Sequence, residues 1–286
     1  MNAPRSIAVL THTDSGDTHE PLHRLLAEAA TAGIEVLLSA EEATKHGLAE
    51  GPGVRIDQDP PVDGAELAVV LGGDGTILRA LRMFAGRGVP VFALNFGAIG
   101  FLATVDRDEV DDGLRRVVTG DFETLSMPAL AFDGGGEVHR AASDVSFHRR
   151  PSGRVAQLAY MVEDHQLGMV RCDGLVAATP VGSTGYNLAN GGPLLAWGVE
   201  GFVVSFIAPH SLTARAVVVA PGSALAVMNC SEREAVDVTT DGRTVCELAP
   251  RERIEVRFEH DRMLLAQIPG STFYGRLRDK FGRIAY

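Results

Sequence analysis

Asp74 is the residue of this chain whose type and surroundings are best suited to chemistry, because it lies among glycines where an apolar run gives way to a helical pattern. The run Leu67 to Leu71 has the unalternating character of a parallel strand that is covered on both faces. Apolar residues then recur at helical spacing, at Ile77, Leu78, Leu81 and Phe84. A turn of this kind lies at the carboxyl edge of an open α/β sheet, where glycines let a diphosphate approach the backbone amides. We therefore expect Asp74 and the adjoining Gly72, Gly73, Gly75 and Thr76 to form a turn that binds a phosphate-bearing ligand, although a Gly-Asp-Gly sequence can also be a simple turn.

A second glycine-rich stretch runs from Asp173 to Pro193. Within it, Gly182-Ser183-Thr184-Gly185 follows a β-rich segment and can present several amides and two hydroxyls to one ligand. Tyr186 can stack on a base or bond to it. The alternative is a hairpin connection made of small residues, but five glycines beside Ser, Thr, Tyr and two Asn favour a binding loop.

The turn from Asn95 to Phe101 carries two further glycines after another apolar strand, and in isolation it reads equally well as a plain turn. The three cysteines, Cys172, Cys230 and Cys246, are odd in number and lack metal-site spacing, so we expect reduced thiols. The histidines do not cluster into a metal site. No protein metal cluster is expected, and Asp74 is the one candidate metal ligand.

Composition excludes several classes of function. The 286 residues are 45% apolar and 22% charged, enough for a sizeable core, and the net charge of −11 argues against a general nucleic-acid or anionic-membrane surface. No Gly-x-x-x-x-Gly-Lys-Ser/Thr motif is present, so a P-loop site is excluded. Only Lys45 and Lys280 are lysines, so we expect amides, arginine and a metal ion to meet a phosphate.

No run of about 18 apolar residues and no signal-peptide pattern appears, so we expect a soluble cytoplasmic protein without a membrane partner.

The order of elements predicts a doubly wound, mostly parallel α/β sheet in the first part of the chain. A strand at 6–11, a helix that begins near Asp17 and Thr18 and ends at Gly33, and a strand at 34–38 form a first β-α-β unit. Residues 40–66 are expected to form an irregular connection. The central strand and helix, a strand at 90–94 and a helix that ends at Gly120 complete this domain.

From Glu123 onward the sequence changes to short β-rich stretches with turn signals such as Asp241-Gly242. One of these stretches is 138–147, and 254–258 and 263–268 are expected to be separate strands near the end. An amphipathic helix is expected at 273–281. We therefore predict three segments: an α/β domain at 1–122, a mostly β domain at 123–261, and a returning C-terminal strand and helix at 262–286.

Taken together, the motifs resemble those of the NAD kinases in order and rough spacing, nearly from end to end of the chain. The matching segments are Gly72-Gly73-Asp74-Gly75-Thr76, the turn 95–101, Cys172-Asp173-Gly174, Thr179 to Tyr186 with Gly191-Gly192-Pro193, and Pro209-His210-Ser211-Leu212. The Gly-Gly-Asp-Gly sequence is shared with lipid, sphingoid and some sugar-phosphate kinases. The threonine-proline loop and the Asn-x-Gly-x-x-Gly-Phe turn are far more specific.

The resemblance implies transfer of a phosphoryl group from ATP or polyphosphate to the 2′-hydroxyl of the adenosine ribose of NAD, with Mg²⁺ or another divalent cation. Asp74 matches the aspartate of the family beside the ribose hydroxyls. It would accept the hydroxyl proton late in the transfer, or orient the nucleophile and help to hold the metal. Asn95 would fix the phosphate-side loop rather than react.

For the NAD side, the resemblance implies that the loop beginning at Thr179, with Ser183, Thr184 and Tyr186, lines the adenine subsite. Asp173 matches an aspartate that reaches the nicotinamide end, often across a subunit boundary, so a homodimer or homotetramer is expected. His210 lies in a matching motif, with a purely structural histidine as the alternative. The C-terminal segment resembles one that packs back on the first domain.

Two positions depart from the family pattern. Ser143-Asp144 stands where the family usually has Asn-Glu, so Ser143 lacks an amide and Asp144 has a shorter stem. Gly185 replaces the usual alanine, which makes the loop more permissive. A lipid or sphingoid kinase, and a protein that senses NAD(H) or NADP(H) without turnover, stay open as alternatives.

Overall fold

The computed structural model describes residues 2–14, 16–57, 61–98, 100–151 and 154–282. The chain divides into two compact units, which are described separately. The first comprises residues 1–126 together with 263–286, and the second comprises residues 127–262.

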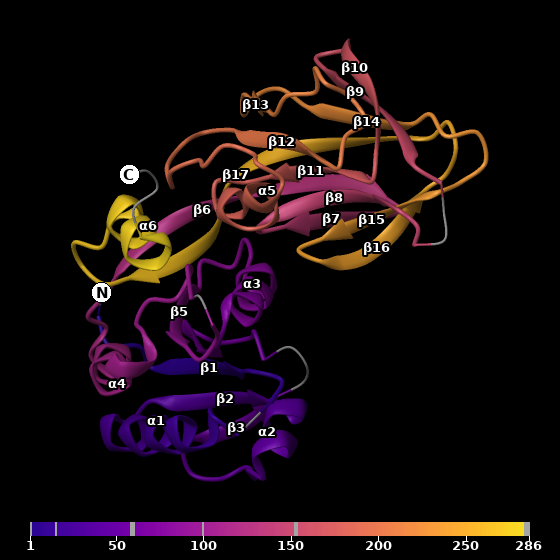
Figure 1. The fold of residues 1–286 in the computed structure, drawn as a ribbon. Coiled ribbons are helices and arrows are strands. Elements are labelled where there is room, and N and C mark those ends of the chain that lie inside the picture. Colours follow the sequence, from indigo (N-terminus) through magenta and orange to yellow (C-terminus); the bar gives the residue numbers. More distant parts are fainter. Residues whose placement is uncertain (1, 15, 58–60, 99, 152–153, 283–286) are drawn as a thin grey trace. The chain divides into compact units, whose positions relative to one another are not determined.

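The first unit is built on a parallel sheet with strand order β17-β5-β4-β1-β2-β3 (Figure 1). The strands are β1 (Ser6–Thr11), β2 (Glu35–Ser39), β3 (Val54–Asp57), β4 (Leu67–Gly72), β5 (Pro90–Asn95) and the end of β17 (Arg253–Gln267). Strands β1, β4 and β5 are buried along their whole length, as expected for central strands covered on both faces.

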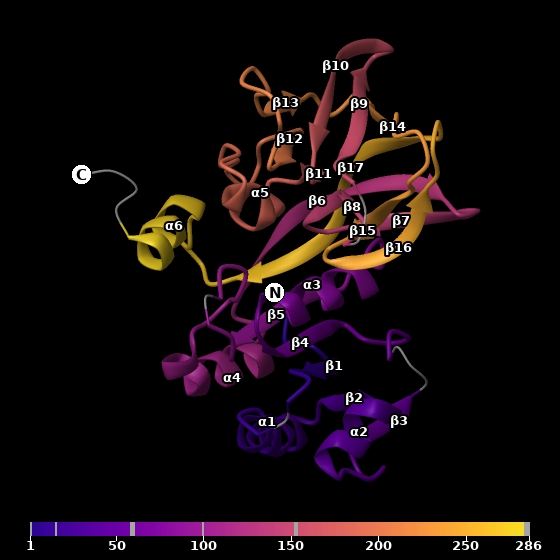
Figure 2. The same ribbon diagram turned by 45° about the vertical axis from the view of Figure 1, so that its right-hand side comes forward.

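Helices cover both faces of this sheet. Helices α1 (His19–Ala32) and α4 (Val110–Thr119) lie on one face and share one apolar core with β1 and β4, whereas α3 (Asp74–Met83) lies on the other face (Figures 1 and 2). Gly33 and Gly120 end α1 and α4 in the left-handed conformation, with φ of 70° at both. The expected doubly wound, mostly parallel sheet is confirmed.

The prediction of an irregular connection between residues 40 and 66 is wrong, because this segment contains a helix and a strand. It contains α2 (Ala40–His46), which Ser39 caps by accepting a hydrogen bond from the Glu42 amide at 3.1 Å, and the edge strand β3. A helix of seven residues is too short to display an apolar stripe. The signal that was present is the spacing of Ser39 and Glu42, which is typical of a capped first turn.

After a short 3₁₀ turn at Arg107–Glu109 and α4, the chain passes into the second unit and returns at its end with α6 (Phe273–Phe281). Phe273 and Leu277 are the buried residues of α6. The α/β and mostly β organisation and the returning C-terminal segment agree with the expected fold class.

The second unit contains mostly antiparallel strands. A six-stranded sheet has the order β13-β12-β11-β8-β15-β16, and the strands of the other sheet in this unit are β10-β9-β14-β17 with β6 and β7. The bounds are β6 (Glu123–Gly134), β7 (Glu137–Ala141), β8 (Asp144–Arg149), β9 (Ala156–Val162), β10 (His165–Cys172), β11 (Gly174–Ala178), β12 (Phe202–Ile207), β13 (Val217–Val219), β14 (Leu225–Asn229), β15 (Val236–Thr240) and β16 (Arg243–Leu248). Side chains from both sheets form one apolar core. Figure 2 shows β9 and β10 side by side as a hairpin.

Three details of the strand pattern differ from expectation. The single strand expected at 138–147 is two strands, β7 and β8, which break at Ala142-Ser143 and pair with different partners. Strands β10 and β16 were not predicted. The two strands expected at 254–258 and 263–268 are one continuous strand, β17, whose middle from Arg257 to Arg262 is exposed or partly exposed.

Within the described part of the chain, no helix has the length and apolar character that crossing a membrane requires. The three cysteines are free thiols, as expected. Burial raises the pKa of the Cys172 thiol to about 12, which makes it unreactive.

Candidate functional site

Asp74 is held at the carboxyl edge of the parallel sheet as the first residue of α3. Both of its carboxylate oxygens accept hydrogen bonds from backbone amides, one from Phe101 at 3.1 Å and one from Leu102 at 2.9 Å. The carboxylate is half-buried. Two bonds to rigid main-chain donors fix the plane of the carboxylate, and each oxygen keeps a further lone pair for a substrate.

Two glycine turns come into direct main-chain contact beside Asp74. A Cβ placed on Gly97 would lie 2.7 Å from the Cα of Gly73, and the Phe96 amide donates to the Gly72 carbonyl at 3.1 Å. Only glycine permits this approach. At Gly75, by contrast, a Cβ would meet nothing within 4 Å, so the packing of the protein does not require glycine there.

Asn95 fixes the second of these turns. Its side chain donates to Asp106 at 3.2 Å and accepts from the Gly97 amide at 2.9 Å. A Cβ on Gly100, whose φ is 66°, would lie 2.0 Å from the Asn95 amide nitrogen. These contacts support the loop-fixing role expected for Asn95. The expected motif also includes Ile99, which lies outside the described residues.

Arg276 of α6 reaches the same loop, which sequence reasoning did not foresee. Its guanidinium donates to the carbonyl oxygens of Phe101, at 3.1 Å, and Ala103, and to the side chain of Gln267 at 2.7 Å. Burial lowers the pKa of Arg276 from its ordinary value, while the nearby carboxylates of Asp106 and Asp74 oppose that change. The only sequence signal was a set of basic residues on the last helix.

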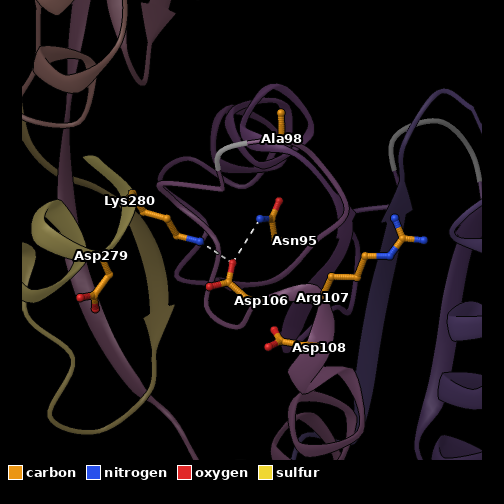
Figure 3. Close-up of a pocket in the computed structure, with 7 residues that line it drawn as sticks. All are labelled: Asn95, Ala98, Asp106, Arg107, Asp108, Asp279 and Lys280. Atoms are coloured by element: carbon orange, nitrogen blue, oxygen red, sulfur yellow. Dashed lines mark hydrogen bonds and ion pairs between the residues drawn. The ribbon is translucent and has the colours of Figure 1, made fainter. Parts of the chain in front are cut away.

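A cavity of about 560 Å³ adjoins this loop in the first unit, and Figure 3 shows its lining. The lining residues are Asn95, Ala98, Asp106, Arg107, Asp108, Asp279 and Lys280. Lys280 and Asn95 both point to the Asp106 carboxylate, as the dashed lines of Figure 3 mark. Burial acts to raise the pKa of Asp106, but these two hydrogen bonds, together with the charges of Lys280 and Arg276, outweigh burial and hold the pKa below its ordinary value. The ionised Asp106 carboxylate therefore holds the loop in place through Asn95 and Lys280.

In the second unit, the loop that begins at Thr179 is anchored on Ser143. The Thr179 amide donates to the Ser143 carbonyl at 2.9 Å, and the Thr179 hydroxyl donates to Ala142 at 2.8 Å. A Cβ on Gly182 would lie 2.1 Å from the Ser143 carbonyl oxygen, so glycine is required at this contact. The structure thus brings the expected residues Ser143 and Thr179 together.

The hydroxyls of Ser183 and Thr184 bond within the loop. Ser183 is fully buried, donates to the Pro180 carbonyl at 2.7 Å and accepts from the Leu195 amide at 2.9 Å. The Thr184 hydroxyl donates to the Val181 carbonyl at 3.0 Å. Ser183 therefore shapes the loop, and its adenine-side role stays a prediction.

Asp144 and Asp241 form a pair of carboxylates at the start of β8. Asp241 accepts backbone hydrogen bonds from Ala142, Ser143 and Asp144 at 2.7 to 3.0 Å. Asp144 is buried and accepts from the Ser143 hydroxyl at 2.9 Å. Burial, followed by the charge of Asp241, raises the pKa of Asp144 to about 6. The sequence had indicated only a turn at Asp241.

Tyr186 begins the short helix α5 (Tyr186–Ala189), and its ring stacks on His148 with centroids 5.6 Å apart and planes 10° from parallel. Its side chain is 38% exposed. Nearby, Arg149 donates to Asp173 at 2.6 Å. Burial lowers the pKa of His148, with Asp237 opposing it, so the stacked imidazole is held toward its neutral form.

His210 is exposed, and its backbone amide donates to the Arg171 carbonyl at 2.7 Å. No group of three His, Cys, Asp or Glu side chains among the described residues could hold a metal ion.

A carboxylate and glycine turns at the carboxyl edge of a parallel sheet, before a helix N-terminus, define the class of α/β proteins that bind phosphate-bearing ligands. Two sequence models support that class. The ATP-NAD kinase N-terminal domain matches residues 56–122, and the ATP-NAD kinase C-terminal domain matches residues 142–267.

Curated relatives agree with these matches. The chain is 35% identical to an NAD kinase of Gemmatimonas aurantiaca over 80% of this chain and 81% of that protein. It is 30% identical to an NAD kinase of Desulforamulus reducens over 96% of both chains. The chain belongs to the NAD kinase family. It is an enzyme of the phosphotransferase class, and the resemblance inferred from the motifs is confirmed.

Solved structures share the fold. The yeast NADH kinase complexed with NADH superposes with a TM-score of 0.86 at 22% identity, covering 100% of this chain and 90% of that one. The NAD kinase from Archaeoglobus fulgidus in complex with ATP gives a TM-score of 0.72 at 23% identity, covering 97% of each chain.

Proposed function

We propose that this NAD kinase transfers a phosphoryl group from ATP to the 2′-hydroxyl of the adenosine ribose of NAD, giving NADP. The observation that carries the proposal is the Asp74 carboxylate, which two amides fix at the carboxyl edge of the sheet. The family match supports the reaction, and the glycine turns around Asp74 support the approach of phosphate.

In this proposal Asp74 accepts a hydrogen bond from the 2′-hydroxyl and so directs the hydroxyl oxygen toward the phosphorus. Asp74 then takes the hydroxyl proton late in the transfer. Phosphoryl transfer with a loose transition state depends mainly on positioning and charge neutralisation. A carboxylate whose plane is already fixed loses little freedom when the hydroxyl binds. Positioning is therefore the larger contribution that we assign to Asp74.

We assign Mg²⁺, or another divalent cation, to a place between Asp74 and the donor phosphates. Magnesium commonly uses one or two carboxylates together with waters and phosphate oxygens, and Asp74 supplies one such carboxylate. When bound, the ion neutralises charge on the transferring phosphoryl group. Polyphosphate stays open as an alternative donor.

We assign NAD binding to the second unit. Tyr186 would stack on the adenine, since its ring is partly exposed and its orientation is fixed by His148. Thr184, Gly185 and the Ser143–Asp144 pair would line the same subsite, and Asp173 would reach the nicotinamide end. A homodimer or homotetramer and a cytoplasmic location stay predictions.

The test is incubation of the purified chain with NAD or NADH, Mg²⁺, and ATP or polyphosphate. NADP is read through an NADP-specific dehydrogenase, and NADPH is read directly by enzymatic cycling. We expect NADP from NAD and ATP. Measurable NAD binding without NADP from any donor would instead identify a sensor, and phosphorylated lipid on a thin-layer plate would identify a lipid kinase.

The first residue-level prediction is that Asp74→Asn lowers kcat by about 10³-fold or more, because the amide cannot accept a proton and binds a cation weakly. The variant should still fold with a moderately lower melting temperature, since the asparagine oxygen accepts one of the two amide hydrogen bonds while its nitrogen cannot accept the other. Steady-state kinetics and thermal unfolding check both parts. Activity like that of the wild type in the Asn variant would remove Asp74 from the mechanism.

A further inference from the structure

Arg276 and Asp74 bond to opposite ends of one peptide group. Arg276 Nη1 donates to the carbonyl oxygen of Phe101 at 3.1 Å, and the amide of the next residue, Leu102, donates to Asp74 Oδ1 at 2.9 Å. The carbonyl of Phe101 and the amide of Leu102 belong to the same planar unit. A rotation of that unit at one end therefore moves the hydrogen bond at the other.

We propose that Arg276 is a positioning residue for phosphoryl transfer, which orients the Asp74 carboxylate through the peptide group between Phe101 and Leu102. The inference rests on the proposed function, in which Asp74 acts on the hydroxyl of the substrate. Helix α6 thereby belongs to the catalytic apparatus, although it lies about two hundred positions after Asp74 in the sequence.

The guanidinium of Arg276 is itself held in place. Its Nη1 also bonds to the Ala103 carbonyl, and its Nη2 donates to the Gln267 side chain at 2.7 Å. Gln267 is buried at the end of β17. A planar group with fixed donors can bridge two carbonyls and an amide at once, which the single ammonium of a lysine cannot reproduce.

Aromatic packing restricts the same segment from α6. The ring of Phe101 meets Phe273 edge-on with centroids 5.9 Å apart and meets Phe281 at 5.6 Å. The rings restrain the side chain of Phe101, while Arg276 restrains its carbonyl. The rings contact only the side chain, whereas Arg276 bonds to the peptide group itself, so we assign the direction of the Leu102 amide to Arg276.

The charge of Arg276 strengthens this connection. A carbonyl that accepts a hydrogen bond from a cation becomes more polarised, and its peptide N–H becomes a better donor. The Leu102 amide should therefore bind the Asp74 carboxylate more firmly when Arg276 is present. The effect is local, because it depends on one shared peptide group.

The experiment compares Arg276→Gln and Arg276→Lys with Arg278→Gln as a matched control. Arg278 lies on the same helix and carries the same charge, but its side chain is 74% exposed and pairs with Asp279. We expect Arg276→Gln to lower kcat by about 10- to 100-fold while the KM for NAD stays within about threefold, since a small misplacement of a catalytic group acts on the chemical step. Arg276→Lys should recover part of the loss, and Arg278→Gln should match the wild type.

Two further measurements separate positioning from a general structural effect. In the Asp74→Asn background, Arg276→Gln should cause no further loss of the residual rate, because the group that it orients has been removed. Amide hydrogen exchange at Leu102 should be faster in Arg276→Gln than in the wild type and unchanged in Arg278→Gln. Unaltered kcat, an equal loss in the Asp74→Asn background, or unaltered exchange at Leu102 would each overturn the proposal.

The exchange measurement also keeps the two proposals apart. If the wild-type protein makes no NADP, the proposed function fails, yet faster exchange at Leu102 in Arg276→Gln would still show that Arg276 holds this peptide. If NADP forms normally and the kcat of Arg276→Gln equals that of the wild type, only the positioning role fails.

Discussion

Asp144 is a buried carboxyl that lies beside a second carboxylate at the start of β8. Its carboxyl is buried beside Asp241, and burial with that second charge raises its pKa to about 6. A carboxyl whose pKa is higher in the folded chain than in the unfolded chain binds more protons when folded. Folding stability therefore falls as pH rises through the window from about 4 to 6, and the full cost applies above it.

We predict that Asp144→Asn loses this dependence. The difference in the free energy of unfolding between the variant and the wild type should grow in favour of the variant as the pH rises from 4 to 7. The increase should reach up to about 3 kcal/mol, which corresponds to the difference between the folded and unfolded pKa values of Asp144. The asparagine oxygen can still accept from Ser143. Urea unfolding at several pH values measures the effect.

The matched control for that experiment is Asp164→Asn in the same unit, whose side chain is 87% exposed. It should leave the pH dependence unchanged. An Asp144→Asn variant whose stability relative to the wild type is the same at pH 4 and pH 7 would contradict the assigned cause.

Candidate site residues could be selected from the sequence only where a recognisable motif surrounds them. Asp74 stands among glycines and Tyr186 follows a distinctive loop, so local pattern was sufficient to select them. Arg276 and Asp241 have no such surroundings. Their partners lie more than 90 positions away in the chain, and only the folded structure brings them to Phe101 and Ser143.

At the scale of elements, the glycine turn after β4 and the glycine turn after β5 are in direct contact and support each other. The backbones of Gly73 and Gly97 are in contact. A side chain could rotate away from an added atom, but these backbone atoms cannot. We predict that Gly97→Ala destabilises the protein by about 1 to 3 kcal/mol, because its Cβ would overlap the Cα of Gly73. It should also lower kcat by at least about tenfold, since the turn that carries Asp74 must shift.

Gly75→Ala is the comparison for that experiment. Its Cβ would meet no atom within 4 Å and it lies within α3, so the melting temperature should stay the same or rise. Thermal unfolding of the two variants checks the contrast. Equal melting temperatures in Gly97→Ala and the wild type would mean that the turns adjust without cost.

Long, strongly patterned elements were predictable, and short or half-exposed ones were not. Strand β1 has the bounds that its apolar residues indicate, and α1 ends at the expected Gly33. Helix α2 has only seven residues, and β10 exposes most of its side chains, so neither shows a clear period. The break between β7 and β8 depends on pairing with different strands, which no local pattern records.

At the scale of the molecule, the first unit is completed by the last residues of the chain. We predict that a chain ending at Ser271 loses activity by at least about 100-fold and loses several kcal/mol of stability in the first unit. The truncation removes α6 with the buried Phe273 and Leu277, as well as Arg276.

The single tryptophan, Trp197, lies in the second unit and makes the prediction selective. Its fluorescence should be close to that of the full chain after truncation, whereas thermal unfolding followed by helical circular dichroism should begin at a lower temperature. Full-length Tyr274→Ala, which changes an exposed position of α6, should behave as the wild type. Collapse of the Trp197 signal together with the helical signal would show that the two units do not fold separately.

Strand β17, which leaves the second unit and adds to the edge of the first beside β5, has a consequence for the newly made chain. Ribosomes release a protein from its N-terminus, and domains ordinarily fold as they emerge. Here the parallel sheet must wait for the strand beside β5 until the ribosome has synthesised the whole second unit and the end of β17. The peptide that holds Asp74 waits even longer, for Arg276. A nascent chain of this protein is therefore expected to gain activity only after α6 has left the ribosome, so that products released before Arg276 consume no nucleotide.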